Sequence, residues 1–211
     1  MTLTGHSLAC KRGENLIFSE INLSVIPGSI CFVKGPNGSG KSTLLRLLAG
    51  LLGTAEGHLT LDKIDITNDR EIRAEKFLYL GHQNVLKQHL TVKEQISFWQ
   101  GITKKCYDFE TDPMNVQPIL NKKLHQCSEG QSRRVALARL IIEMKKLWLL
   151  DEPTASLDTV NIQLFKRILK DHCNNGGSAV IATHDNIGLK PSSDIYLSLD
   201  KSSLQQNDPF I

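Results

Sequence analysis

The stretch Gly35-Pro36-Asn37-Gly38-Ser39-Gly40-Lys41-Ser42 decides the fold class of this chain. It matches the pattern G-x-x-x-x-G-K-[ST] and stands between a short apolar segment, 29–34, and a segment of helical composition, 42–48. Glycines let the backbone curl so that consecutive N–H groups point at phosphate oxygens, and the following helix N-terminus adds partial positive charge. The stretch, with Thr43 after it, therefore predicts a phosphate-binding loop of the Walker A type. We expect Lys41 to contact the β- and γ-phosphates of a nucleotide and the Ser42 hydroxyl to bind Mg²⁺.

A second apolar segment ends in two carboxylates, Leu147-Trp148-Leu149-Leu150-Asp151-Glu152. In doubly wound sheets, ligands bind beyond the carboxyl ends of the strands. We therefore expect Asp151 to hold Mg²⁺, through a water molecule. Glu152 is then the natural general base for a water molecule that attacks ATP.

Strand-like and helix-like segments alternate along the rest of the chain. The patterns predict strands at 3–9, 21–26, 29–34, 58–61, 77–80, 147–150, 179–183 and 195–199, and helices at 42–48, 91–102, 128–144 and 158–170. Ser128 and Gln131 form a capping-box pair at the start of the third helix. Asn174-Asn175-Gly176-Gly177 reads as a turn from helix to strand. Strands separated by helices predict an α/β fold with a mainly parallel sheet.

The composition is that of a globular protein that reaches a membrane only through a partner. The 211 residues carry a net charge of +3, and the Lys and Arg residues are scattered, which argues against nucleic acid as a partner. The five cysteines show no C-x-x-C pair, so we expect reduced thiols in a cytoplasmic protein: Cys10, Cys31, Cys106, Cys127 and Cys173. We see no secretory segment, and the apolar stretch 44–52 is too short to cross a bilayer.

The stretch Cys127-Ser128-Glu129-Gly130-Gln131 resembles the signature motif of the ATP-binding-cassette (ABC) superfamily, whose usual form is L-S-G-G-Q. Further family motifs fall in the same order, with Gln83 at the Q-loop, Ser156-Leu157-Asp158 at the D-loop and His184 at the switch histidine. The resemblance covers nearly the whole chain. It implies a P-loop NTPase of the ABC ATPase type, a single domain over 1–211. Its mainly parallel sheet core would carry an antiparallel β subdomain and a small helical subdomain at about 84–140.

The same resemblance implies a sandwich of two ATPase subunits with ATP and Mg²⁺ between them. Each nucleotide would lie between the phosphate loop of one subunit and Ser128, Gly130 and Gln131 of the other, with Asp158 nearby. A helix N-terminus at Ser128 is an anion site. Because the chain already has a phosphate loop of its own, we expect the anion at Ser128 to be the γ-phosphate of the nucleotide bound to the partner subunit. Gln83 would contact Mg²⁺ and the attacking water, and His184 would act beside Glu152.

Two positions depart from the usual family pattern. Glu129 replaces the first glycine of the signature, and a carboxylate near a γ-phosphate is unfavourable unless it points away. Many relatives stack an aromatic ring on adenine where Arg12 stands here, and its planar guanidinium can also stack on the base. Phe18 is the other candidate for this contact, although its position in a strand favours a place in the core.

Within the superfamily, the chain most resembles the ATP-binding subunits of haem exporters that serve cytochrome c maturation. Three features carry this resemblance: the stretch 79–83 with the residues that follow it up to Glu94, the double arginine Arg133-Arg134, and the lack of a regulatory extension after His184. It implies a peripheral subunit on the cytoplasmic face of the inner membrane that drives integral membrane transporter subunits. The segment from Gln83 to about Ile102 would form the docking surface.

Within that docking segment, Phe98 and Trp99 are either contact residues or core. No C-x-x-C-H motif is present, so direct haem binding is not expected. The alternatives are an ABC ATPase for another cargo, such as an ion, lipid or lipoprotein, and a soluble ABC-type regulatory ATPase.

Overall fold

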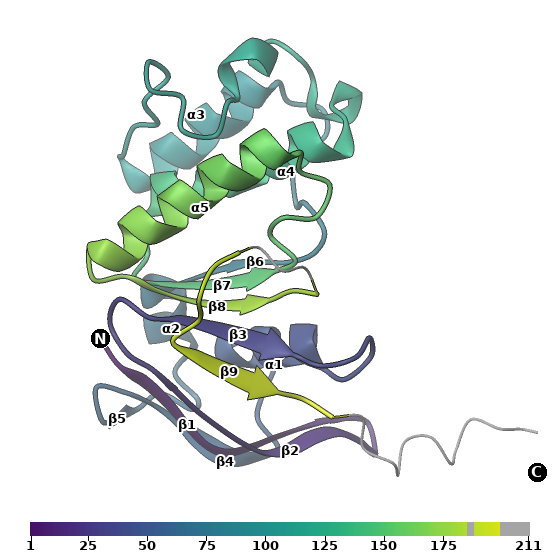
Figure 1. Cartoon of the computed structure of the whole chain (residues 1–211), viewed down its shortest axis with the longest axis vertical. Helices are drawn as coiled ribbons and strands as arrows, with labels where there is room; N and C mark the ends of the chain where they lie inside the picture. Colours follow the sequence, from purple (N-terminus) through teal and green to yellow (C-terminus); the bar gives the residue numbers. More distant parts are fainter. Residues whose placement is uncertain (185–187, 199–211) are drawn as a thin grey trace, which may run out of the picture.

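A five-stranded parallel sheet lies at the centre of the molecule, and a four-stranded antiparallel sheet lies beside it (Figure 1). The computed structural model describes residues 1–184 and 188–198. The parallel sheet has the order β6-β7-β8-β3-β9: Phe77–Leu80, Leu147–Asp151, Ser178–Ala182, Ile30–Lys34 and Ser193–Tyr196. The antiparallel sheet has the order β2-β1-β4-β5: Asn15–Val25, Leu3–Arg12, Glu56–Leu61 and Ile64–Asp65. This arrangement confirms the predicted mainly parallel sheet core with an antiparallel β subdomain.

The two faces of the parallel sheet are buried in two different cores. Along β7, Leu147 and Leu149 point towards the antiparallel sheet and the helix α1 (Lys41–Leu48), whereas Trp148 and Leu150 point the other way. Successive side chains of a strand alternate between its faces, so an unbroken apolar run is what a strand buried on both sides requires. The site described below is held by strands that contact both cores.

Three longer helices cover the face of the parallel sheet that is turned away from the antiparallel sheet (Figure 1): α3 (Val92–Thr103), α4 (Glu129–Glu143) and α5 (Thr159–Asn174). Each begins at a side-chain cap, namely Thr91, Ser128 and Asp158. Such a cap satisfies one of the N–H groups that the first turn leaves free and contributes about 1 kcal/mol. The capping box predicted for Ser128 and Gln131 is confirmed.

The segment between α3 and α4 contains two short 3₁₀ helices, η1 (Gln117–Ile119) and η2 (Leu124–Gln126). Its apolar residues join the same core as α3 and α4, which pack against each other. The predicted helical subdomain at about 84–140 comprises α3, η1, η2 and most of α4; the division of the chain into one domain with such a subdomain stays a prediction. In the described residues, no helix is long and apolar enough to span a membrane.

The structure differs from the sequence prediction at several element boundaries. Strand β2 begins at Asn15, well before the predicted 21, because a tight hairpin around Gly13 pairs Arg12 with Asn15. Helix α5 runs on to Asn174, so the first residue of the predicted turn is helical. The last predicted strand, 195–199, is β9 at Ser193–Tyr196, and Leu199 lies outside the described residues.

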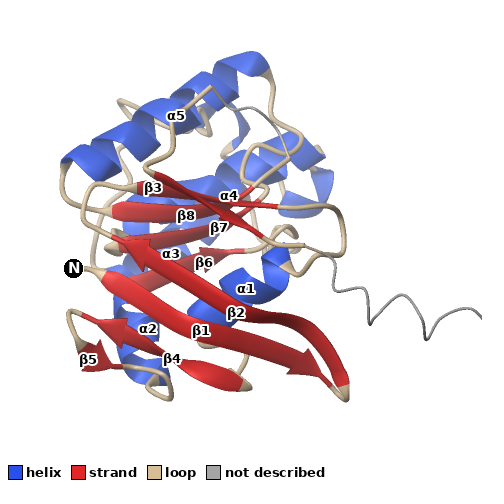
Figure 2. Ribbon diagram, turned by 60° about the horizontal axis from the view of Figure 1, so that its bottom comes forward, coloured by secondary structure: helices blue, strands red, loops and turns tan. Residues whose placement is uncertain are grey.

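Besides the two 3₁₀ helices, two elements were not predicted from the sequence. Helix α2 (Arg70–Lys76) is highly charged and has no apolar periodicity, but Asp69 caps it by accepting a hydrogen bond from the Ile72 N–H. Strand β5 is only two residues long. Figure 2 shows α1 next to the antiparallel strands, so the phosphate loop that precedes α1 emerges between the two sheets.

Candidate active site

The phosphate loop, residues 35–43, connects β3 to α1. Gly40 is the N-cap of α1 with φ of +94°, a backbone conformation that favours glycine. A Cβ atom there would lie 2.8 Å from Cγ2 of Ile17 and 3.1 Å from Cδ1 of Phe18. Glycine is therefore required at this position for both conformation and space. Phe18 is buried beneath the loop with 4% exposure, which confirms its interpretation as core.

Helix α1 differs from α3, α4 and α5 in its first turn. Those three and α2 have a side-chain cap, whereas among the described α-helices α1 has no side chain capping its N-terminus. Its first N–H groups therefore remain available to an anion placed at the loop. This is the arrangement that the sequence predicted for a phosphate site.

The ammonium group of Lys41 lies inside the loop. Nζ donates to the carbonyl oxygens of Gly35 and Pro36, both at 2.9 Å, and the residue is 8% exposed. Burial lowers the pKa of Lys41, while the nearby carboxylates of Glu152 and Asp151 act in the opposite direction. Lys41 is thus a partly desolvated cation that faces two acidic groups.

Asp151 ends β7 and is almost completely buried, with 3% exposure. Its Oδ2 atom has no hydrogen-bond partner among the described residues. A buried carboxylate oxygen without a donor is costly unless a cation binds it. Because oxygen ligands are what Mg²⁺ prefers, Asp151 together with the nearby Ser42 fits a Mg²⁺ site.

Glu152 and His184 are brought together by the pairing of two neighbouring strands. Asp151 pairs with Ala182, and the Glu152 N–H donates to the Ala182 carbonyl at 2.8 Å. Glu152 has a left-handed backbone with φ of +47°. Its Oε2 accepts a hydrogen bond from the His184 N–H at 3.4 Å, and its Oε1 lies 3.7 Å from Nε2 of His184. The predicted pair at the strand ends is therefore adjacent in space.

These groups line one hollow of about 580 Å³, which we call the nucleotide hollow. Arg12 reaches it from the end of β1, and its contact with the base stays a prediction. Its lining residues are Arg12, Ile17, Asn37, Gly38, Gly40, Lys41, Ser42, Thr43, His82, Asp151, Glu152, Ala155 and His184. Of the remaining loop residues, Pro36 contacts Lys41 through its carbonyl, and Ser39 is buried beneath the loop with its Oγ unpaired among the described residues.

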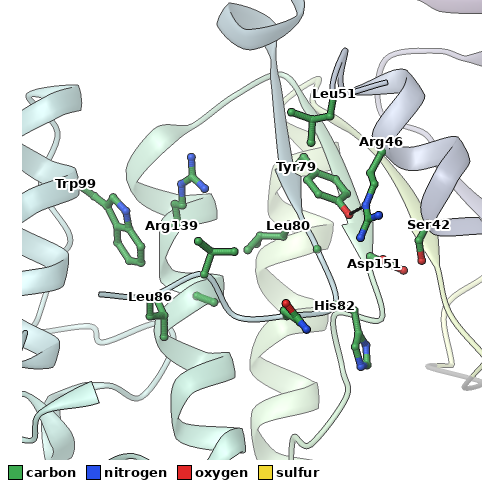
Figure 3. Close-up of a pocket in the computed structure, with 14 residues that line it drawn as sticks. Ser42, Arg46, Leu51, Tyr79, Leu80, His82, Leu86, Trp99, Arg139 and Asp151 are labelled. Atoms are coloured by element: carbon green, nitrogen blue, oxygen red, sulfur yellow. Dashed lines mark hydrogen bonds between the residues drawn. The ribbon is translucent and has the colours of Figure 1, made fainter. Parts of the chain in front are cut away.

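Gln83 does not line the nucleotide hollow but the hollow next to it. This second hollow, also about 580 Å³, shares Ser42, His82 and Asp151 with the first (Figure 3). From there it extends past Tyr79 and Leu86 towards α3 and α4; we call it the lateral groove. Gln83 thus lines the hollow that also contains Ser42 and Asp151, the other two predicted Mg²⁺ ligands. His82, which lines both hollows, was not singled out from the sequence.

The signature residues lie in a third hollow of about 450 Å³. It is lined by Ser128, Glu129, Gly130, Gln131, Arg134, Ser156, Leu157, Asp158 and Asn161, and none of these lines the nucleotide hollow. The described part of the chain therefore does not bring its signature to its own phosphate loop.

The backbone of the signature helix touches the D-loop. A Cβ atom on Gly130 would lie 2.4 Å from the carbonyl oxygen of Ser156, so this glycine permits a close approach of helix and loop. Asp158 is the N-cap of α5 and accepts from the Asn161 N–H at 2.8 Å. That hydrogen bond is the main reason why the pKa of Asp158 is lowered. Asp158 thus has a structural task besides the nucleotide contact that the family resemblance implied.

Comparison with known proteins finds relatives of this sequence over most of the chain. A family model described as ABC transporter matches residues 18–155. The cytochrome c biogenesis ATP-binding export protein CcmA of Rhizobium meliloti is 37% identical over 210 residues, covering 94% of this chain and 98% of the relative. The protein of the same name from Mesorhizobium japonicum is 39% identical over 193 residues, covering 90% and 95%.

Solved structures show the same fold. A dimeric ATP-binding cassette in a post-hydrolysis state, bound to ADP and Pi, matches with a TM-score of 0.76 and 27% identity, covering 94% of this chain and 97% of the other. An ATP-binding protein from Pyrococcus furiosus, titled as a putative ABC transporter, matches with a TM-score of 0.77 over 93% and 98% of the two chains. At 20% identity, the second match supports the fold alone.

Proposed function

The chain belongs to the ABC transporter family of ATP-binding proteins, and from that premise we propose that it is the ATPase subunit that drives a haem exporter in cytochrome c maturation. The observation that carries the proposal is the likeness, over almost the full length of both chains, to export proteins named for cytochrome c biogenesis. The fold and the ABC ATPase activity belong to the family; the cargo and the partners are what we propose.

In the proposed reaction, ATP binds with its phosphates in the loop 35–43 and its base beside Arg12. Lys41 leaves the carbonyl oxygens of its loop for the β- and γ-phosphates. Glu152 accepts a proton from the water that attacks the γ-phosphate, which yields ADP and phosphate. The His184 N–H orients the Glu152 carboxylate for this step, as its contact at 3.4 Å supports.

Ser42, Asp151 and Gln83 are the proposed Mg²⁺ ligands, directly or through water. Mg²⁺, when bound, neutralises charge on the phosphates. Ser42 and Asp151 line both the nucleotide hollow and the lateral groove, and Gln83 lines the groove. We assign Gln83 to the side of the metal site that faces the groove, because it lies there together with both other ligands.

The second half of each nucleotide site comes from a second ATPase subunit in this proposal. Ser128, Gly130 and Gln131 lie in a different hollow from the phosphate loop, so one chain cannot surround the γ-phosphate with both motifs. The consecutive residues Ala155 and Ser156 line the nucleotide hollow and the signature hollow respectively. The D-loop therefore lies between the two surfaces that would meet in the dimer. Glu129 is exposed beside them, which leaves its carboxylate free to point away from the phosphate.

We place the integral membrane subunit in the lateral groove. Its walls combine apolar side chains with two arginines, one from α1 and one from α4 (Figure 3): Leu51, Leu80, Leu86 and Trp99 with Arg46 and Arg139. Val85 is 88% exposed at its edge, and Phe98 and Ile102 on α3 are also exposed. Trp99 is part of the core, with 7% exposure. Phe98 is exposed, and Nζ of Lys87 lies 3.6 Å from the centre of its ring.

An apolar floor with basic walls suits a short amphipathic segment that carries acidic residues, held at the cytoplasmic face of the inner membrane. Because Gln83, Ser42 and Asp151 line the same groove, a shift of the bound segment would displace the proposed Mg²⁺ ligands through direct contact.

The test uses a subunit that binds ATP but hydrolyses it slowly. Glu152→Gln removes the proton acceptor and should lower the hydrolysis rate by about 10²–10⁴-fold without loss of ATP binding. The tagged variant is isolated from detergent-solubilised membranes with Mg-ATP, and the proteins that accompany it are identified by mass spectrometry. Lys41→Ala, which should not trap ATP, is the matched control.

Recovery of integral cytochrome c maturation subunits with Glu152→Gln, and not with Lys41→Ala, supports the proposal. Cells that lack the chain should then lose covalently bound haem in their c-type cytochromes, as seen by haem staining, and only the unaltered chain should restore it. Recovery of a different permease would assign another cargo. If no membrane protein is recovered, a soluble regulatory ATPase is the better description.

A further inference from the structure

Arg133 is a buried cation beneath the active site. It lies on the second turn of α4, next to Arg134, and only 2% of the residue is exposed. Burial lowers the pKa of Arg133, and the negative charges of Asp151, Glu152 and Glu129 oppose this effect. A guanidinium is costly to bury, so its hydrogen bonds decide whether the position is stable.

All five N–H donors of this guanidinium have an acceptor. Nε donates to the Pro153 carbonyl at 3.1 Å, and Nη2 donates to the carbonyls of Asp151 and Glu152 at 2.7 and 2.6 Å. Nη1 donates to the Gly81 carbonyl at 2.9 Å and to Oδ1 of Asn84 at 3.0 Å. One side chain of the signature helix therefore holds the backbone around Glu152 and also the loop that carries Gln83.

The three acceptors at 151–153 are consecutive carbonyl groups that converge on one cation. In an extended strand, successive carbonyls point to opposite sides, so this convergence requires a change of backbone direction. The left-handed conformation of Glu152 provides it. Without a donor group in their midst, three aligned carbonyl dipoles would repel one another, and Glu152 would be free to relax to an ordinary conformation.

We propose that Arg133 is the positioning residue that fixes the backbone of Glu152 and the loop 81–84 to the signature helix, so that the general base and Gln83 keep their places relative to the signature. This inference rests on the proposed function for the roles of Glu152 and Gln83. It goes beyond that function because Arg133 touches neither nucleotide nor water in the proposed reaction.

A second buried arginine gives a matched control. Arg73 is 4% exposed and, like Arg133, donates to backbone carbonyls, those of Ile66, Thr67 and Leu47. It lies in α2 and is not among the residues that line the nucleotide hollow. Substitutions at both sites remove a buried cation from carbonyl acceptors, but only the Arg133 site contacts the catalytic backbone.

The experiment compares Arg133→Gln and Arg73→Gln in the full chain, with ATP affinity, kcat, KM and thermal stability as readouts. Both variants should lose stability, because each leaves carbonyls unpaired. Arg133→Gln should also lower kcat by about 10²-fold, as expected when a catalytic group shifts by about 1 Å, while ATP affinity changes little. Arg73→Gln should keep kcat and KM near the values of the unaltered chain. Arg133→Lys, which keeps the charge and three donors, should recover part of the lost rate.

Amide hydrogen exchange gives a second readout that does not depend on hydrolysis. Peptides that cover 81–86 and 151–155 should exchange faster in Arg133→Lys and Arg133→Gln than in Arg73→Gln. A folded Arg133→Gln with unchanged kcat, or an equal loss of kcat in Arg73→Gln, overturns the proposal, and so does unchanged exchange in both peptides. If the unaltered chain fails to hydrolyse ATP, the proposed function fails, and the exchange data still decide the positioning role.

Discussion

The Gly130→Ala substitution would place a Cβ atom 2.4 Å from the Ser156 carbonyl oxygen. Ordinary contacts between carbon and oxygen are about 3.3 Å or longer, so the signature helix and the D-loop would have to separate by about 1 Å. The Cβ atom is fixed to the backbone of the helix and the oxygen belongs to the backbone of the D-loop, so no flexible side chain can absorb the overlap. Forced overlaps of this kind cost about 1–3 kcal/mol.

Gly101 is the control for the intrinsic effect of alanine in a helix. It lies in α3, is exposed, and a Cβ atom there meets nothing within 4 Å. Gly101→Ala should therefore stabilise the protein by about 0.5–1 kcal/mol. Because the helix propensity is common to both substitutions, Gly130→Ala should be less stable than Gly101→Ala by about 1–3 kcal/mol. For a domain of this size, that corresponds to a difference of about 2–12 °C in Tm.

The functional effect is measured as ATP-dependent dimerisation by size-exclusion chromatography with light scattering. Each substitution is combined with Glu152→Gln, so that hydrolysis does not reopen the dimer. We expect the Gly101→Ala combination to dimerise with Mg-ATP and the Gly130→Ala combination to stay monomeric, since its signature helix is displaced from the D-loop. Equal Tm values for the two substitutions, together with normal dimerisation of both, would refute the reasoning.

Three further predictions concern a phosphate contact, a thiol and a half-buried imidazole. Lys41→Ala should weaken ATP binding by about 10–100-fold, the worth of a hydrogen bond to a charged group, and calorimetry that shows unchanged affinity would contradict the phosphate-loop role. Alkylation of the half-buried Cys127 should slow when the Glu152→Gln variant binds Mg-ATP, because the partner subunit then covers the signature next to this thiol. The exposed Cys106 should react at an unchanged rate, and a mass-spectrometric time course measures both rates. Equal protection of both thiols would argue against the dimer. Burial lowers the pKa of His172 from its ordinary value of 6.5, so between the lowered pKa and 6.5 the unfolded chain binds more protons than the folded one. Stability should therefore fall from pH 7.5 to 5.5 in urea unfolding, and His172→Gln should flatten that fall; an equally steep fall in the variant would assign it to another group.

The residues whose tasks depend on neighbouring sequence were predictable. The phosphate loop places Gly40, Lys41 and Ser42 within one turn of the chain, and the capping box of Ser128 and Gln131 spans four residues. Over such short distances, the local sequence pattern is enough to predict the geometry. The strand ends at Asp151 and at His184 follow from the rule that parallel strands share a carboxyl edge. For the same reason, the predicted phosphate loop and carboxylates were brought together as expected, although their catalytic roles stay predictions.

The residues that act through distant backbone could not be predicted. Arg133 finds its acceptors about 20 and 50 residues away in the sequence, at Pro153 and Gly81, and nothing near the double arginine marks the first of the two as buried. Gln83 was expected at the metal, but its place in a groove separate from the nucleotide hollow depends on how α3 and α4 pack. Helix α2 was missed because its charged sequence has no apolar stripe for a periodicity argument to detect.

The order of strands in the parallel sheet has a consequence for synthesis on the ribosome. Strand β3 lies between β8 and β9, yet it leaves the ribosome about 140 residues before the first of them, a delay of roughly 7–30 s at ordinary rates of translation. The antiparallel strands β1, β2 and β4 can pair during that time, since all of them precede residue 62. Until β8 and β9 are synthesised, the edges of β3 at Cys31, Phe32 and Val33 stay unpaired, in water or bound to a chaperone. A nascent chain is thus most prone to aggregate after its first sheet has formed, and it gains its phosphate site only after β7 and β8 have been synthesised.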